Sequence, residues 1–138
     1  MGTPYKLLQL ALAVFGVIML LLYPLAWVWP SGWAWHHGSP HDSVYFMMIV
    51  GLYATLGVFL LNAARNPANN LSVIWFAVWS SVVHAAIMAV QSFTNEHQLG
   101  HLWGDVPALL LVAIVLSVLV RSAALKQPAP DLAGARSR

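Results

Sequence analysis

The residues with the clearest chemical potential are two histidines and an aspartate that stand in otherwise apolar stretches. His84 follows the run Ser80–Val83, and His101 and Asp105 form an i, i+4 pair inside Gly100–Pro107. A polar side chain in hydrocarbon is costly when it is left unpaired. We therefore expect His84 and Asp105 to pair, with His101 converging on the same point from one turn away.

Three kinds of chemistry fit these side chains. A hydrogen-bonded pair would fix helix register, with Ser80 and Ser81 in support. A transition metal (Zn, Cu or non-haem Fe) would suit two imidazoles and a carboxylate with one open coordination position. A proton or small ligand is the third occupant, because histidine titrates near neutral pH. Haem ligation by His84 and His101 is a variant that their expected difference in depth disfavours.

Further side chains are predicted to lie near His84, His101 and Asp105. If the third and fourth helices share an outer level, His84 lies roughly 13 Å and Asp105 roughly 10 Å below it. Residues of the second helix reach similar depths, and Gln91 stands on the face of His84. Asp42 is expected to close a capping box with Ser39 at the start of the second helix. The supporting residues are Ser80, Ser81, Tyr45, Met48, Gln91 and Asp42.

The composition is that of a membrane protein. Of the 138 residues, 60% are hydrophobic and 7% are charged, against roughly 45–50% and about 25% in soluble domains. The net charge of +2 is too small and dispersed for a nucleic-acid partner. The absence of cysteine excludes disulfides, thiolate metal sites and thiol catalysis. No catalytic triad, phosphate loop or carboxylate pair is recognisable, so we do not favour an enzyme.

Four apolar stretches are each long enough to cross ~30 Å of hydrocarbon. We predict an all-α fold, a four-transmembrane-helix bundle that forms one domain over residues 1–122. Residues 123–138 are polar and proline-rich, which predicts a disordered cytoplasmic tail. The spans are expected at about 4–29, 40–65, 67–93 and 96–122.

Prolines and small residues set the expected geometry of these helices. Pro24 should kink or end the first span. Arg65–Pro67 predicts a short turn, so that spans two and three form an antiparallel hairpin. Pro107 should kink span four, unless that helix starts at Val106 with Asp105 as its cap. Gly51, Ala54 and Gly57 recur at every third residue, which allows a neighbouring backbone to approach closely.

The basic residues lie on one side of the predicted bundle, and all six histidines and three of the four acidic residues lie on the other. With four spans, every lysine and arginine falls on the side of both termini, which the positive-inside rule makes cytoplasmic. We expect a multi-pass protein of a bacterial inner membrane, with the His/Asp site opening to the periplasmic face. The basic residues are Lys6, Arg65, Arg121, Lys126, Arg136 and Arg138. The opposite side holds His36, His37, His41, His84, His97, His101, Asp42, Glu96 and Asp105.

Part of the sequence resembles a known family. The segments concerned are Pro40–Tyr53, Gly57–Leu60, Trp79–Ala85 and Gly100–Leu109. They are similar to a family of small bacterial integral membrane proteins whose domain has no known function. The resemblance covers about residues 40–120 and implies a four-helix membrane protein, without an activity to transfer. The aromatic segment Trp27–Gly38, typical of the lipid headgroup layer, lies outside it.

The function that these observations favour is a membrane-embedded binding or accessory protein. Its His/Asp site would open to the periplasmic face, with a transition metal as one candidate occupant. A structural subunit of a larger membrane complex is the alternative, in which His84 and Asp105 only pack. A proton-coupled carrier of small solutes is a third, although the inner halves of the spans carry no charge. The expected partners are the lipid bilayer and a second copy or a membrane complex.

Overall fold

The computed structural model describes residues 2–28, 42–94 and 96–123, and all regular structure within them is helical. This confirms the all-α prediction, and four helical segments there are long and apolar enough to cross a membrane. The predicted tail, apart from residue 123, and the aromatic segment beyond Val28 lie outside the described residues. The elements are α1 (Thr3–Leu20), α2 (Leu22–Val28), α3 (Val44–Arg65), the 3₁₀ helix η3 (Pro67–Asn70), α4 (Leu71–Thr94), the 3₁₀ helix η4 (Glu96–Leu102) and α5 (Asp105–Ser122).

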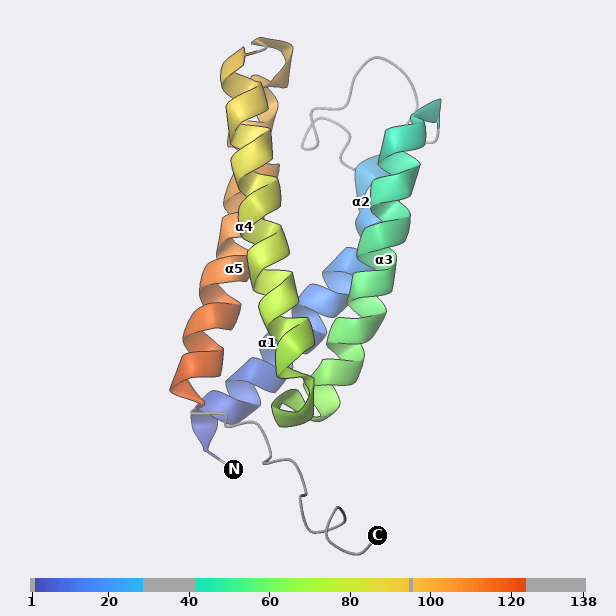
Figure 1. Ribbon diagram of the computed structural model, residues 1–138. Coiled ribbons are helices and arrows are strands. Elements are labelled where there is room, and N and C mark those ends of the chain that lie inside the picture. Colours follow the sequence, from blue (N-terminus) through green and yellow to red (C-terminus); the bar gives the residue numbers. More distant parts are fainter. Residues whose placement is uncertain (1, 29–41, 95, 124–138) are drawn as a thin grey trace, which may run out of the picture.

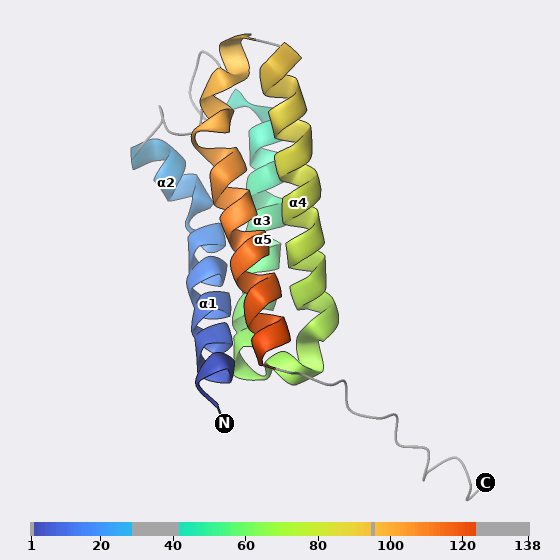
Figure 2. The ribbon, with the colours of Figure 1, turned by 90° about the vertical axis from the view of Figure 1, so that its left-hand side faces the viewer.

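The first predicted span is broken between α1 and α2, three residues before Pro24. Proline has no N–H, so it cannot bond to the carbonyl four residues earlier, which belongs to Leu20. The helix accordingly ends at Leu20 and resumes at Leu22. Figure 2 shows α2 turned away from the axis of α1.

Helix α3 starts later than predicted. Its cap is Ser43, whose side chain accepts a hydrogen bond from the Phe46 N–H at 3.3 Å. Asp42 stands before the helix and does not occupy the third helical position that a capping box requires. The predicted capping residue, Ser39, lies outside the described residues.

The start of α5 settles the role of Pro107. The helix begins at Asp105 after Gly104, so Pro107 is its third residue. N–H groups in the first turn have no partner within the helix, and proline is therefore tolerated there without a kink. The fourth span consists of η4, a short turn and α5 rather than one bent helix.

The helices pack as two pairs, α1 with α3 and α4 with α5. A Cβ atom built on Gly57 would lie 2.7 Å from the carbonyl oxygen of Gly16, so the α1 and α3 backbones touch there. The turn η3 is short and α3 and α4 run antiparallel as predicted, but these two helices share few contacts. Figure 1 shows them diverging away from η3. Of the predicted glycines, Gly57 makes a close approach, whereas a Cβ on Gly51 would meet open space.

One half of the bundle holds the apolar core. We call it the basic half, because the start of α1, η3 and the end of α5 lie there (Figures 1 and 2) with Lys6, Arg65 and Arg121. Gln9 Nε2 donates to the Ala64 carbonyl at 2.9 Å in this half. Its fully buried core side chains are Leu8, Leu12, Leu60, Ala63, Ile74, Ala77 and Leu116. The other half contains the pocket described next, and we call it the pocket half.

Candidate functional site

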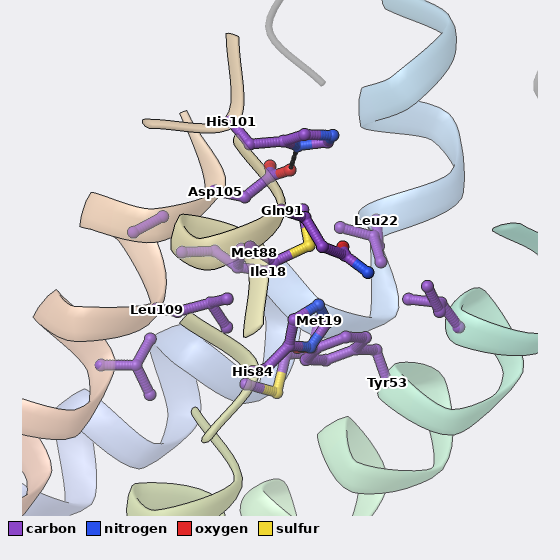
Figure 3. A pocket seen from close by; sticks show the side chains of 13 residues that line it. Ile18, Met19, Leu22, Tyr53, His84, Met88, Gln91, His101, Asp105 and Leu109 are labelled. Atoms are coloured by element: carbon purple, nitrogen blue, oxygen red, sulfur yellow. Dashed lines mark hydrogen bonds and ion pairs between the residues drawn. The ribbon is translucent and has the colours of Figure 1, made fainter. Parts of the chain in front are cut away.

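A pocket of about 260 Å³ lies among the helices of the pocket half. Its walls are mostly apolar, and five polar side chains interrupt them (Figure 3). These five come from α3, α4, η4 and α5, which brings residues far apart in the sequence to one cavity. The lining residues are Ile18, Met19, Leu22, Ile49, Tyr53, His84, Met88, Gln91, His101, Asp105, Ala108, Leu109 and Val112.

His101 and Asp105 form the first polar pair. His101 belongs to η4 and Asp105 is the first residue of α5, so the short turn between them folds the imidazole back over the carboxylate. Nδ1 of His101 lies 2.5 Å from Oδ2 of Asp105. When the Asp105 carboxyl is ionised it only accepts, and Nδ1 of His101 is then the donor. His101 is 6% exposed, and this contact confirms the convergence predicted from the i, i+4 spacing.

His84 and Tyr53 form the second polar pair. Nδ1 of His84 lies 2.7 Å from the Tyr53 hydroxyl oxygen, and the two ring centroids are 5.8 Å apart. Either group can be the donor, depending on the imidazole tautomer. The expected pairing of His84 with Asp105 is therefore wrong: each residue has another hydrogen-bond partner. This hydrogen bond crosses from α3 to α4, where the two helices diverge.

Gln91 lies between the two pairs in Figure 3, on the same helix as His84. The sequence placed it on the face of His84, and both side chains line the pocket. The sulfur-bearing side chains of Met19 and Met88 also line it. The pocket thus has a hydrogen-bonded polar pair at each end and a third polar side chain, Gln91, on the wall between them.

The other predicted supporting residues do not line the pocket. Ser80 Oγ donates to the carbonyl of Ala77 in its own helix at 3.2 Å. Ser81 is buried and 2% exposed, but it is not a lining residue. Tyr45 and Met48 are 79% and 64% exposed, so they face away from the interior. Asp42 is exposed ahead of α3.

Tyr53 is the site residue that the sequence reasoning missed, although a signal for it exists. The buried face of α3 contains Phe46, Gly57 and Leu60. Tyr53 stands seven residues from Phe46 and from Leu60, so helical periodicity places it on that face. The prediction of Tyr45 and Met48 rests on depth alone, and depth does not say which way a side chain points.

A metal centre built from His84, His101 and Asp105 stays a prediction. Among the described residues, no group of three or more His, Cys, Asp or Glu side chains is arranged to hold a metal ion. Nδ1 of His84 and Nδ1 of His101 are both engaged in hydrogen bonds. Any ion here would need ligands in addition to the His101–Asp105 pair.

A comparison with known families finds one match. The model of the family described as "Family of unknown function (DUF6632)" matches residues 2–138. The resemblance to a family without known function is confirmed, and it extends beyond residues 40–120 to include the aromatic segment Trp27–Gly38. No curated protein and no solved structure matches the chain. Because the family match covers nearly its whole length, this helical protein belongs to the family of unknown function DUF6632.

Proposed function

We propose that this protein is a small integral membrane protein that binds a small, largely apolar ligand in its pocket. The observation that carries the proposal is the pair of histidine-centred hydrogen bonds, His101–Asp105 and His84–Tyr53, that line one apolar cavity. Binding sites for small molecules are typically apolar cavities with a few well-placed polar groups. The ligand would be held by its apolar surface and oriented by these polar groups.

The size of the pocket restricts the ligand. A cavity of about 150 Å³ lined by apolar side chains holds benzene, and this pocket measures about 260 Å³. It therefore suits a single substituted ring or a molecule of similar bulk. A ligand with this character partitions into a bilayer, so it would reach the pocket from the membrane.

The proposed setting is the inner membrane of a bacterium, with both ends of the chain in the cytoplasm. The positive-inside rule would place the basic half on the cytoplasmic side. The pocket half would then lie in the outer leaflet, and the His/Asp site would open toward the periplasm. A homo-oligomer or a larger membrane complex would fit this role, with the protein as its ligand-binding accessory subunit.

The proposal is tested with ¹⁹F NMR of 4-fluorophenol added to the protein in lipid nanodiscs. The probe is a ring with one hydroxyl group, and it should show saturable line broadening beyond that in empty nanodiscs. The variant Tyr53→Phe with His84→Leu should weaken binding, because the hydroxyl loses its partners. Ser117→Ala, an exchange on α5 outside the pocket lining, is the matched control and should bind like the unchanged protein.

Equal broadening in protein-containing and empty nanodiscs would show that the pocket takes no such ligand. Elemental analysis of the purified protein tests the metal alternative separately. A stoichiometric transition metal that is lost in His101→Ala would replace the organic ligand as the occupant.

A further inference from the structure

We propose that the ligand belongs to the quinone and hydroquinone class, a six-membered ring with oxygen atoms at opposite corners. This inference rests on the proposed function and names its ligand. It follows from where the polar groups lie, from their hydrogen-bonding character and from the side chains between them.

The polar groups of the pocket stand at two levels. Tyr53 and His84 form the deeper level, His101 and Asp105 form the outer one, and Gln91 lies between them (Figure 3). The backbone of α4 rises about 10 Å between His84 and Gln91, which are seven residues apart at 1.5 Å per residue, so the polar side chains of the pocket are spread along its length. A ring with oxygen atoms at opposite corners, extended by a hydrogen bond of about 2.8 Å at each end, spans a comparable length. A ligand with one polar group would satisfy only one level.

Each level offers groups that both donate and accept hydrogen bonds. The hydroxyl of Tyr53 and the imidazole of His84 do so at the deeper level, and the amide of Gln91 does so on the side of them that faces the outer pair. A quinone presents carbonyl oxygens that only accept, whereas a hydroquinone presents hydroxyl groups that also donate. The same pocket would accommodate both forms, because its partners reverse their roles by rotating a hydroxyl group or changing a tautomer.

The wall between the two levels suits a flat ring. It is lined by apolar side chains and by Met88, whose sulfur lies near the middle of the view in Figure 3, while Met19 lines the pocket beside His84. Thioether sulfur makes favourable contacts with aromatic rings. The pocket volume of about 260 Å³ leaves room for ring substituents but not for a second ring system of equal size.

The experiment is displacement of 4-fluorophenol from the protein in nanodiscs by three unlabelled compounds. Hydroquinone, with para oxygens, should displace the probe at a concentration about threefold to tenfold lower than phenol, the effect of one additional hydrogen bond. Catechol, with the two oxygens adjacent, should compete no better than phenol, since its second oxygen does not reach the other level.

A variant of Gln91, the polar side chain between the two levels, completes the test. Both competitors are also measured with the variant Gln91→Leu. The concentrations of hydroquinone and phenol that displace half of the probe should differ less in this variant than in the unchanged protein. The described structure shows no hydrogen bond from the Gln91 side chain, and the residue is exposed, so the exchange should preserve the fold. Circular dichroism checks this, and Ser117→Ala again serves as the control.

The outcomes separate the two proposals. If the probe binds and hydroquinone competes only as well as phenol, the ligand class is wrong and the binding function stands. If catechol matches hydroquinone, the two-level arrangement is wrong. If the probe does not bind at all, the proposed function fails and the ligand class fails with it.

Discussion

The two halves of the bundle are built in opposite ways. In the basic half, side chains such as Leu12, Leu60 and Ile74 are fully buried and fill the space between all four spans. In the pocket half, α3 and α4 diverge and leave a cavity lined by two hydrogen-bonded pairs. The pocket half has polar side chains that line this cavity, namely Tyr53, His84, Gln91, His101 and Asp105. The comparison indicates that tight packing in one half holds the helices together while the other half stays open.

The difference between the two halves is consistent with how helices associate in a lipid bilayer. Lipid tails are as apolar as leucine, so helices associate there through close packing and hydrogen bonds rather than through exclusion of water. The basic half relies on close packing. In the pocket half, the Tyr53–His84 hydrogen bond joins α3 to α4 across the gap between them.

The largest expected effect comes from removing a packed side chain of the basic half. Leu12→Ala should lower the free energy of unfolding by about 2–3 kcal/mol, because it leaves a cavity where Leu12 is fully buried. Leu109→Ala, its counterpart on the pocket wall, should cost clearly less, since an opening already exists there. Unfolding in mixed micelles measures both, and equal losses would show that the two halves do not differ in packing.

A second prediction concerns the contact between α1 and α3. Gly57→Ala should cost about 1–3 kcal/mol, because its Cβ would meet the Gly16 carbonyl oxygen and force the two backbones apart. Gly51→Ala is the matched control in the same helix, where the added methyl group meets open space. The same unfolding assay compares the two, and similar losses would contradict a close contact at Gly57.

A third prediction concerns the hydrogen bond across the pocket half. Tyr53→Phe and His84→Ala should each destabilise the protein, and the double variant should lose about 0.5–1.5 kcal/mol less than the sum. The cycle of His84→Ala with Asp105→Ala should show a smaller coupling, because those residues have other partners. A larger coupling in the second cycle would restore the pairing predicted from the sequence.

The smallest effect is expected at Pro107. Pro107→Ala should change stability by less than about 0.5 kcal/mol, because the proline stands in the first turn of α5 where no N–H is needed. A strong effect in the same unfolding assay would mean that this proline shapes the pocket half after all.

The sequence predicted the fold well where the length of apolar runs decides it. Four spans follow from that length alone, and the turn at Asn66 and Pro67 follows from its capping chemistry. The packing partner of α3 could not be predicted in this way. Adjacency in the sequence favours α4, whereas α3 packs chiefly against α1. The close approach to Gly57 of α3 is instead made by Gly16 of α1, a single small residue within a run of larger apolar ones.

The candidate site was predictable where a local rule applies. His101 and Asp105 are four residues apart, and that spacing brought them into contact even though a turn rather than a continuous helix separates them. The partner of His84 depends on the rotation of α3 about its axis, which brings Tyr53 into the pocket. Helix rise gives the depth of a residue but not its direction around the helix, so it indicates Tyr45 and Met48 and does not single out Tyr53.

The pairing of α1 with α3 bears on how the chain is made. Both members of the first pair precede η3 in the sequence, and both members of the second pair follow it. The first pair can therefore assemble in the membrane while the rest of the chain is still being synthesised. A chain divided within Pro67–Asn70 would leave each fragment with its principal helix contact intact, so two separately expressed fragments should reassemble into the native bundle.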